Sequence, residues 1–350
     1  MFERPEDALS SWPVAEGLPV RALLDGGLIN NTWSVGNPPR FALQQVNAIF
    51  PPSIHDRIAL VSERLNAVGI TCPELIRTSS QDWTARGPKG TMWRLMTWVP
   101  GTSFHRFPGP SHAYDAAQLI GRFHQALLPL LEELEPLRVG AHDTTAHMMR
   151  LEAMLEDCAS HRLAAGILEV GQGVLEGWER CRAVLPNALP LRPTHGDLKA
   201  SNIRFDPAGS RAVALIDLDT LGRDTLDVEL GDAFRSWCNA SGEDENTARL
   251  DTDILAAGVQ GYLSTADFVS ADERAAIVPG TWRISLELSA RFCVDAFEER
   301  YFGWSEEIAP TRGEHNLLRA QGQLSLARAI ESQRASLERV VAEAVSRHSS

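Results

Sequence analysis

The sequence predicts an α+β fold of two lobes, a small β-rich lobe over residues 1–100 and a larger, mainly helical lobe over residues 101–350. Three observations lead to this prediction. Short apolar or alternating runs, bounded by Gly, Pro and Asn, fill the first hundred residues. Apolar residues at helical spacing dominate the rest of the chain. A chain of 350 residues with 44% hydrophobic content can also bury more than one core.

The first lobe is predicted to hold three strands and a helix. The strands are the runs NTWSV (31–35), RFALQQV (40–46) and MWRLMTWV (92–99). The helix covers residues 52–69, because apolar side chains recur at helical spacing and a glycine follows as a C-terminal cap. A Pro-Gly pair directly after the third strand marks the boundary between the lobes.

The second lobe is predicted to be helical with one exception. Apolar stripes at helical spacing indicate helices over about 114–135, 146–164, 248–264, 272–299 and 314–345. The exception is NIRFDPAGSRAVALIDLD (202–219), in which two strand-like runs flank the turn DPAG. We therefore predict a hairpin in the middle of this lobe.

Three oxygen-bearing side chains should gather at the open end of that hairpin. Antiparallel pairing brings Asn202, just before the first strand, near Asp217, just after the second. Asp197 lies on the loop that leads in, HGDLKASN, and should face the same space. Carboxylate and amide oxygens suit Mg²⁺ bound with phosphates. A carboxylate that does not bind the metal can accept a proton from an attacking hydroxyl group.

HGDLKASN followed by LIDLD resembles the catalytic segments of the aminoglycoside phosphotransferase and choline kinase superfamily, whose fold is protein-kinase-like. The resemblance implies a kinase that uses ATP and Mg²⁺, with a nucleotide-binding N-terminal lobe and a catalytic, acceptor-binding C-terminal lobe. It gives Asp197 the role of catalytic base and Lys199 a place near the transferred phosphoryl group. Asn202 and Asp217 correspond to the metal ligands. Asp219, on the same side of an extended segment as Asp217, is a second metal candidate.

Further segments are similar to the bacterial N-acetylhexosamine 1-kinases, among them GGLINNTW, AHDTTAHMMRLE and ARFCVDAFEERYF. This resemblance implies that the acceptor is a hexose or N-acetylhexosamine, phosphorylated on its anomeric hydroxyl group. Arg291, Asp295 and Tyr301 are the predicted sugar contacts, since the first two lie one turn apart on a helix and the third follows at its end. His142 and Asp143 form a second polar cluster. An ordinary Arg-Asp pair on a solvated helix face is the alternative for the first cluster.

The nucleotide site departs from the usual kinase pattern. No G-x-G-x-x-G is present, so backbone amides around Gly26, Gly27 and Asn30 are expected to hold the phosphates. Met96 and Trp98, at the end of a strand, are expected beside the adenine.

Gln44 stands where kinases of this superfamily usually carry a phosphate-binding lysine. Either Lys199 and the metal supply the missing charge, or the chain is a degenerate kinase that serves as a nucleotide-binding scaffold. Because Asp197, Asn202 and Asp217 are all present, we expect an active enzyme.

Two residues near the predicted site are assigned structural roles. His195 is expected to orient the catalytic loop through its backbone. Asp232, in ELGDAFR, is expected to brace the same loop by hydrogen bonds to its backbone. His195 is not expected to act as an acid or base, and Asp232 is not expected to touch the substrate.

Composition narrows the classes of partner and acceptor. The N-terminal residues lack the basic start and apolar run of a signal peptide, and no stretch is long and apolar enough to span a membrane, so we expect a cytoplasmic protein. A net charge of −13 disfavours nucleic acids and acidic membranes. It is compatible with an aminoglycoside acceptor, which remains an alternative beside an amino alcohol of the choline or homoserine type. The five cysteines are odd in number and widely spaced, which predicts free thiols.

Overall fold

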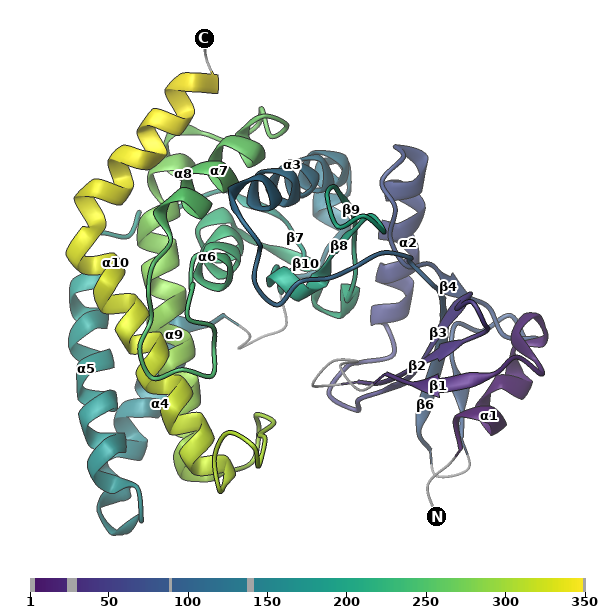
Figure 1. Ribbon diagram of the computed structural model, residues 1–350, viewed down its shortest axis with the longest axis horizontal. Helices are drawn as coiled ribbons and strands as arrows, with labels where there is room; N and C mark the ends of the chain where they lie inside the picture. The colour runs from purple at the N-terminus through teal and green to yellow at the C-terminus, as the bar shows by residue number, and fades with distance from the viewer. Residues whose placement is uncertain (1–3, 24–29, 88–89, 137–141, 349–350) are drawn as a thin grey trace. The chain divides into compact units, whose positions relative to one another are not determined.

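The computed structural model describes residues 4–23, 30–87, 90–136 and 142–348 (Figure 1). The chain divides into two compact units. The first comprises Met1–Gly101 with Val213–Asp219, and the second comprises Thr102–Ala212 with Thr220–Ser350. An antiparallel sheet dominates the first unit and helices dominate the second, so the predicted α+β class is confirmed.

The sheet of the first unit has the strand order β1-β2-β3-β6-β4, with β5 also paired to β6. All its pairings are antiparallel. The three predicted strands are β2, β3 and β6, and the short strands were not foreseen. The bounds are β1 (Val20–Ala22), β2 (Asn31–Val35), β3 (Phe41–Val46), β4 (Leu75–Ile76), β5 (Ala85–Arg86) and β6 (Met92–Thr97).

The core of the first unit lies on one face of this sheet. Alternate residues of β3 are buried there, as the period of a half-buried strand requires, and they pack with Trp93 and Leu95 of β6. The N-terminal segment, with helix α1 (Pro5–Ala8), adds Trp12 to this core. The Trp12 indole N–H donates to the carbonyl oxygen of Ile76 at 2.8 Å, so the buried ring leaves no polar atom unpaired.

Helix α2 (Ile54–Ala67) buries Ile58, Val61 and Leu65, which are spaced for one helical face. It ends where predicted, because Gly69 takes a left-handed conformation at φ 74°. The backbone N–H of Ile70 then donates to the carbonyl of Leu65 at 2.9 Å and closes the last turn.

The segment Val213–Asp219 is distant in sequence from the rest of the first unit. Thr71 forms a parallel bridge with Ala214 and ties the segment to that unit. The predicted hairpin is present, since β8 (Ile203–Phe205) and β9 (Ala212–Leu215) form a two-stranded sheet. Two residues beyond β9, Asp217 has a left-handed backbone at φ 65°.

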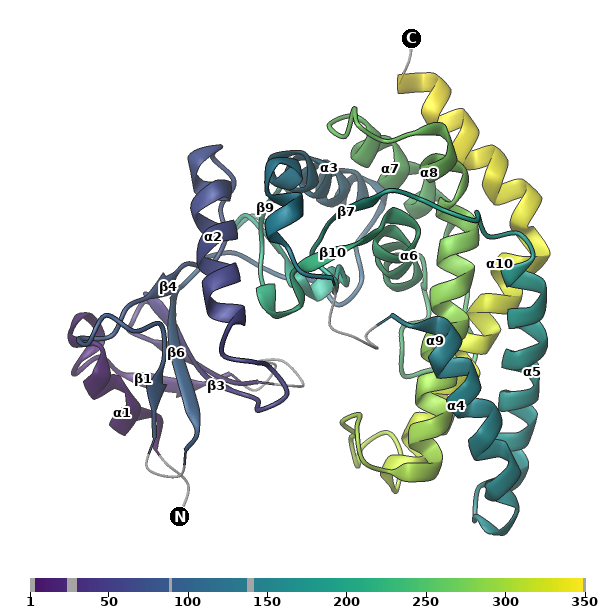
Figure 2. The same ribbon diagram turned by 180° about the vertical axis from the view of Figure 1, so that it is seen from behind.

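The second unit is built on helix α9, which packs against α4, α5, α6 and α10 (Figure 2). Helix α3 packs mainly against α7. A short antiparallel sheet of β7 and β10 pairs Thr194 with Gly222. The bounds are α3 (Pro110–Leu127), α4 (Thr144–Asp157), α5 (Ala164–Arg182), β7 (Leu191–Thr194), β10 (Gly222–Thr225), α6 (Leu226–Trp237), α7 (Thr252–Leu263), α8 (Ala271–Ala275), α9 (Ile277–Glu298) and α10 (Arg312–His348).

Helices α5 and α6 were not predicted. Four glycines interrupt the sequence pattern of α5, and all four allow close packing, since a Cβ on Gly166, Gly171, Gly173 or Gly177 would meet a leucine side chain within 3 Å. Helix α6 is buried almost all round, and it carries buried charged residues beside the apolar residues Leu226, Leu230, Phe234 and Trp237. Polar residues in a buried helix need partners, and those of α6 find them at the site described below.

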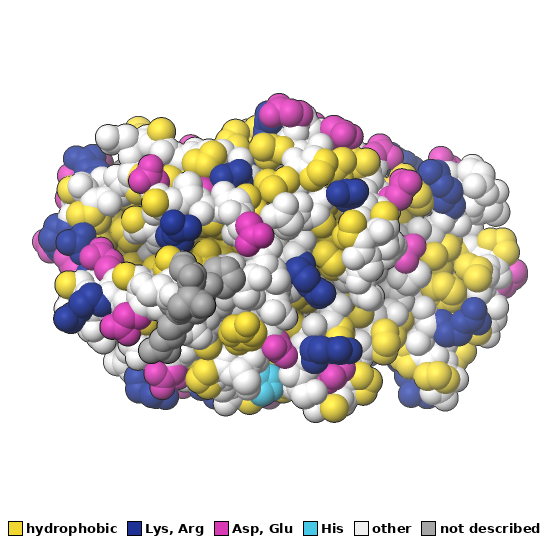
Figure 3. Space-filling model, turned by 90° about the horizontal axis from the view of Figure 1, so that it is seen from above, with side chains coloured by type: hydrophobic (Ala, Val, Ile, Leu, Met, Phe, Trp, Pro, Cys, Tyr) yellow, Lys and Arg dark blue, Asp and Glu magenta, His cyan; other side chains and the backbone are white. Residues whose placement is uncertain are grey.

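Within the described ranges no helix is both long and apolar enough to cross a membrane. All five cysteines are free, as predicted, and all five are buried. Acidic and basic side chains are interspersed over the face shown in Figure 3.

Candidate active site

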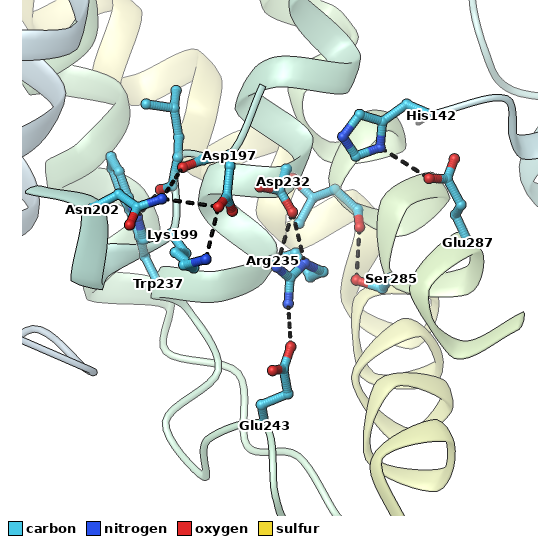
Figure 4. A network of polar contacts seen from close by, with 12 residues as sticks. His142, Asp197, Lys199, Asn202, Asp232, Arg235, Trp237, Glu243, Ser285 and Glu287 are labelled. Carbon is cyan, nitrogen blue, oxygen red and sulfur yellow. Dashed lines mark hydrogen bonds and ion pairs between the residues drawn. The ribbon is translucent and has the colours of Figure 1, made fainter. Parts of the chain in front are cut away.

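The catalytic loop brings together three of the predicted residues (Figure 4). It follows β7 and ends in a 3₁₀ turn, Ala200–Asn202. The ammonium group of Lys199 lies 2.7 Å from Oδ2 of Asp197. The Asn202 side-chain amide donates to the same oxygen and to the Asp197 carbonyl, both at 2.9 Å. Asp197 is thus held from two sides.

Asp197 is ionised at neutral pH. Burial acts to raise the pKa of its carboxyl group, but the positive charge of Lys199 and the hydrogen bonds from Lys199 and Asn202 outweigh this effect. The net result is a pKa below the usual range. The carboxylate can therefore accept a hydrogen bond from an incoming hydroxyl group.

Glu229 of α6 braces the catalytic loop, which corrects the expectation for Asp232. Its carboxylate accepts the backbone N–H of His195 at 2.7 Å and that of Gly196 at 3.0 Å. Burial acts to raise the pKa of Glu229, but its bond to His124 and the charges nearby hold the pKa below the usual value. ELGDAFR offers two acidic residues three positions apart, and nothing in the sequence indicates which one faces the loop.

Two further bonds fix the backbone of the loop. The Thr220 hydroxyl group donates to the carbonyl of His195 at 2.7 Å. The indole N–H of Trp237, also in α6, donates to the carbonyl of Leu198 at 2.8 Å. His195 itself is fully buried, in keeping with its expected structural role.

The predicted metal ligands have suitable chemistry. The Asn202 amide nitrogen is committed to Asp197, which leaves its carbonyl oxygen as the ligand atom. Asp217 belongs to the first unit, so its approach to Asn202 stays a prediction. Among the described residues no three His, Cys, Asp or Glu side chains form a closed metal cluster. A site of two protein oxygens that shares its metal with phosphate fits Mg²⁺.

Asp219 is not placed as a metal ligand, which corrects the prediction. The guanidinium group of Arg94 contacts both of its carboxylate oxygens, at 2.5 and 2.8 Å. The Asn30 side-chain amide adds a bond of 2.6 Å to Oδ2. Since the side chain is also buried, its oxygens serve the protein itself.

The residues expected to touch phosphate are likewise engaged within the first unit. Gln44 accepts a hydrogen bond from Nε of Arg94 at 2.8 Å and donates to Thr32 at 3.1 Å. Asn30 is buried, and its carbonyl oxygen accepts the backbone N–H of Asn47 at 2.9 Å. Gly26 and Gly27 lie outside the described residues.

The strand end expected beside the adenine is also partly committed. Met96 is buried and pairs with Ala42 in the ladder of β3 and β6. The backbone N–H of Trp98 donates to the carbonyl of Arg40 at 3.0 Å. The Trp98 amide is therefore engaged within the first unit, and the place of Met96 and Trp98 beside the adenine stays a prediction.

Beside Asp197 lies a charged cluster that sequence reasoning missed (Figure 4). Arg235 of α6 donates to Asp232 at 2.9 and 3.1 Å and to Glu243 at 3.4 Å. Burial acts to lower the pKa of Arg235, but these two acids, with a smaller effect of Asp197, raise it. Asp232 therefore pairs with an arginine near the catalytic carboxylate rather than with the loop backbone.

A second polar cluster joins α4 to α9. Glu287 accepts a hydrogen bond from His142 at 2.9 Å and one from Thr144 at 2.5 Å. Burial acts to raise the pKa of Glu287, but the His142 bond and the charges of His142 and Arg291 lower it to about 2. Asp143 caps α4 by accepting the backbone N–H of Ala146. Of these two adjacent residues, His142 therefore belongs to the polar cluster, whereas Asp143 caps the helix.

The late-helix residues have different roles. Nη1 of Arg291 lies 3.9 Å from Oε1 of Glu287, so Arg291 belongs to the polar cluster. Its guanidinium carbon also lies 5.6 Å from the centre of the Phe302 ring. Asp295 is buried and accepts three backbone N–H groups, of residues 300, 301 and 302. This bonding corrects its expected contact with the sugar, because the carboxylate shapes the turn instead. Tyr301, on that turn, exposes its side chain.

Residues 21–268 match the phosphotransferase enzyme family known as APH. The match covers most of the chain, and the protein therefore belongs to this family of small-molecule kinases. The predicted superfamily and the kinase-like fold are confirmed.

Solved structures with the same fold differ in what they phosphorylate. An aminoglycoside phosphotransferase from Alicyclobacillus acidocaldarius subsp. acidocaldarius DSM 446 is 16% identical, with a TM-score of 0.63 and 98% of each chain covered. A choline/ethanolamine kinase family protein from Mesorhizobium loti is 18% identical, with a TM-score of 0.53 over 92% of this chain and 98% of the other. The amicoumacin kinase hAmiN, in complex with AMP-PNP, Ca²⁺ and Ami, is 13% identical, with a TM-score of 0.55 over 87% and 88%.

Proposed function

We propose that the protein transfers the γ-phosphoryl group of ATP to the anomeric hydroxyl group of a hexose or N-acetylhexosamine. The arrangement of Asp197, Lys199 and Asn202 is the observation that supports phosphoryl transfer most directly. An ionised carboxylate held by a lysine and an amide can orient a hydroxyl group and take its proton. That AMP-PNP and a divalent cation are bound by a kinase of the same fold supports the proposed cofactors.

In the proposed reaction the acceptor hydroxyl group donates its hydrogen bond to Asp197. As the oxygen attacks the γ-phosphorus, the bond to the β-γ bridging oxygen breaks, and the acceptor proton passes to Asp197 and then to water. Lys199 offsets negative charge on the transferred group. Asn202 and Asp217 would hold Mg²⁺, which when bound neutralises the phosphate charge. Glu229 keeps the loop in place through two backbone bonds.

The charged clusters near Asp197 support a neutral polyol as acceptor. Arg235 is matched by two acids, and Glu287 is matched by His142 and Arg291. These clusters offer both donors and acceptors to ring hydroxyl groups. A polycationic aminoglycoside needs an excess of carboxylates, and a quaternary ammonium group favours an aromatic cage. The resemblance to N-acetylhexosamine 1-kinases adds to this argument.

An acceptor screen tests the proposal. ADP release would be measured with ATP and Mg²⁺ in the presence of hexoses, N-acetylhexosamines, aminoglycosides, choline and homoserine. We expect turnover with one or more sugars. Turnover only with an aminoglycoside or an amino alcohol would reject the sugar and keep the kinase. ATP binding without turnover of any acceptor would favour the alternative of a degenerate kinase that serves as a nucleotide-binding scaffold, which Gln44 in place of the usual lysine suggests.

A matched pair of variants tests the acceptor cluster. Arg291→Ala removes a half-buried guanidinium group from the cluster, whereas Arg300→Ala removes one that is 74% exposed, from the neighbouring turn. We expect the KM for the sugar to rise about tenfold to a hundredfold in the first variant alone, since one lost buried contact costs about 1–3 kcal/mol. Equal KM values in the two variants would remove Arg291 from the acceptor site.

A further inference from the structure

A buried arginine stands beside the position of the missing lysine. Gln44 of β3 and Arg94 of β6 are direct partners in the antiparallel register. Nε of Arg94 donates to Oε1 of Gln44 at 2.8 Å. The side chains of two directly paired residues lie next to each other on the same face of the sheet. The positive charge absent from β3 is therefore present one strand away.

Arg94 is bound to Asp219 by a bidentate ion pair. The two bonds measure 2.5 and 2.8 Å, and both side chains are almost fully buried, at 2% and 1% exposure. A buried ion pair is retained only with good geometry and with its remaining polar atoms satisfied. Asn30 meets that demand by donating to Oδ2 of Asp219, and its own carbonyl oxygen is bonded to the backbone of Asn47.

This ion pair fixes one end of the segment that carries the predicted metal ligand. Asp217 lies two residues before Asp219 and has a left-handed backbone, at φ 65°. A residue other than glycine keeps such a conformation only where the surrounding structure determines it. On the preceding side, Ala214 is bridged to Thr71 and is fully buried. On the following side, the bond between Asp219 and Arg94 restrains the segment within the first unit.

We propose that Arg94 is a positioning residue for the phosphoryl transfer proposed above, on which this inference rests. Bonded to Asp219, it holds the left-handed backbone of Asp217 and with it the direction of the carboxylate that binds the metal. The arginine acts within the protein rather than on phosphate, because its guanidinium group is bonded to Asp219 and Gln44.

The test compares Arg94→Gln, Arg94→Lys and the wild-type protein, with Arg319→Gln as the control. Arg319 is also nearly buried and pairs with a carboxylate, Asp244 at 2.6 Å, but it lies in α10 of the second unit. Two quantities are measured, the hydrogen exchange of peptides covering 213–220 without ligand and the Mg²⁺ concentration that half-saturates ATP binding.

In Arg94→Gln we expect exchange over 213–220 to be about tenfold faster and the Mg²⁺ requirement to rise by about the same factor, an equilibrium change of the size that one charged bond carries. Arg94→Lys should lie between this variant and the wild type, because it keeps the charge and loses the second bond. Arg319→Gln should match the wild type in both measurements. If Arg94→Gln fails to fold, Asp219→Asn breaks the same ion pair from its other side and should show both effects.

The outcomes separate this inference from the proposed function. Wild-type exchange and an unchanged Mg²⁺ requirement in Arg94→Gln would overturn the inference. Faster exchange with an unchanged Mg²⁺ requirement would overturn it too, since Arg94 would then stabilise the segment without orienting Asp217. A wild-type protein that fails to bind ATP at any Mg²⁺ concentration would overturn the proposed function and the inference together.

Discussion

Replacing Glu229 by glutamine changes the support of the catalytic loop without removing a loop residue. One carboxylate oxygen accepts the N–H groups of His195 and His124, at 2.7 and 3.1 Å, and the other accepts the N–H of Gly196 at 3.0 Å. A glutamine has one acceptor oxygen and one NH₂ group. Whichever way the amide turns, one backbone N–H of the loop faces another donor, at a site where Glu229 and His195 are buried.

The size of the effect follows from these bonds. An unsatisfied buried donor costs about 1–3 kcal/mol, and loss of the charge weakens each remaining bond by about 1 kcal/mol. We expect the free energy of unfolding to fall by about 2–4 kcal/mol in Glu229→Gln, measured by urea denaturation at pH 7. Because Asp197 follows directly after Gly196, kcat should fall about tenfold to a hundredfold, with little change in the KM for ATP.

Glu273→Gln serves as the control for this experiment. Glu273 is equally buried and accepts a backbone N–H, that of Ser270 at 2.7 Å, together with bonds from Arg192. Its replacement should lower stability by a similar amount and leave kcat near the wild-type value. An equal fall of kcat in both variants, or a stable and fully active Glu229→Gln, would refute the assigned brace.

Three further predictions follow from the site. Asp197→Asn keeps the shape of the side chain but removes the proton acceptor, so kcat should fall by about 10² or more with unchanged ATP affinity in equilibrium binding; near-normal turnover would exclude Asp197 as the base. Asp217→Ala should abolish Mg²⁺-dependent ATP binding and Asn202→Ala should raise the Mg²⁺ requirement, which calorimetry at several Mg²⁺ concentrations would show; identical Mg²⁺ dependence in the two variants and the wild type would contradict both assignments. Because the folded-state pKa of Glu287 is about 2 and its ordinary value is 4.5, it contributes stability above pH 4.5 that is lost as the pH falls toward 2. The melting temperature of Glu287→Gln should therefore depend less on pH in this window than that of the wild type. An equal slope of melting temperature against pH in the two proteins would count against the buried pair of Glu287 and His142. The raised pKa of His142 has the opposite sign, since burial is outweighed by the Glu287 bond: its contribution is complete below pH 6.5 and is lost as the pH rises through the folded-state pKa.

The sequence by itself determined those features that depend on local pattern. Helical periodicity located α2, which has one buried face and a clear end, and short apolar or alternating runs located strands β2, β3 and β6. The sequence also predicted that Asp197 and Asn202 face the same space, and the Asn202 amide does donate to Asp197. Helix α6 was not predicted, although Leu226, Leu230, Phe234 and Trp237 recur at helical spacing.

Only the tertiary structure decided which partner each polar residue takes. Glu229 rather than Asp232 braces the loop, because the rotation of α6 turns each acid toward a different neighbour. Asp219 binds Arg94, which lies 125 positions earlier in the sequence, and Asp295 turns to backbone amides instead of Arg291. A buried charge needs a partner of opposite charge, and the packing of segments distant in sequence decides which residue that is. The local sequence pattern therefore does not predict the partner.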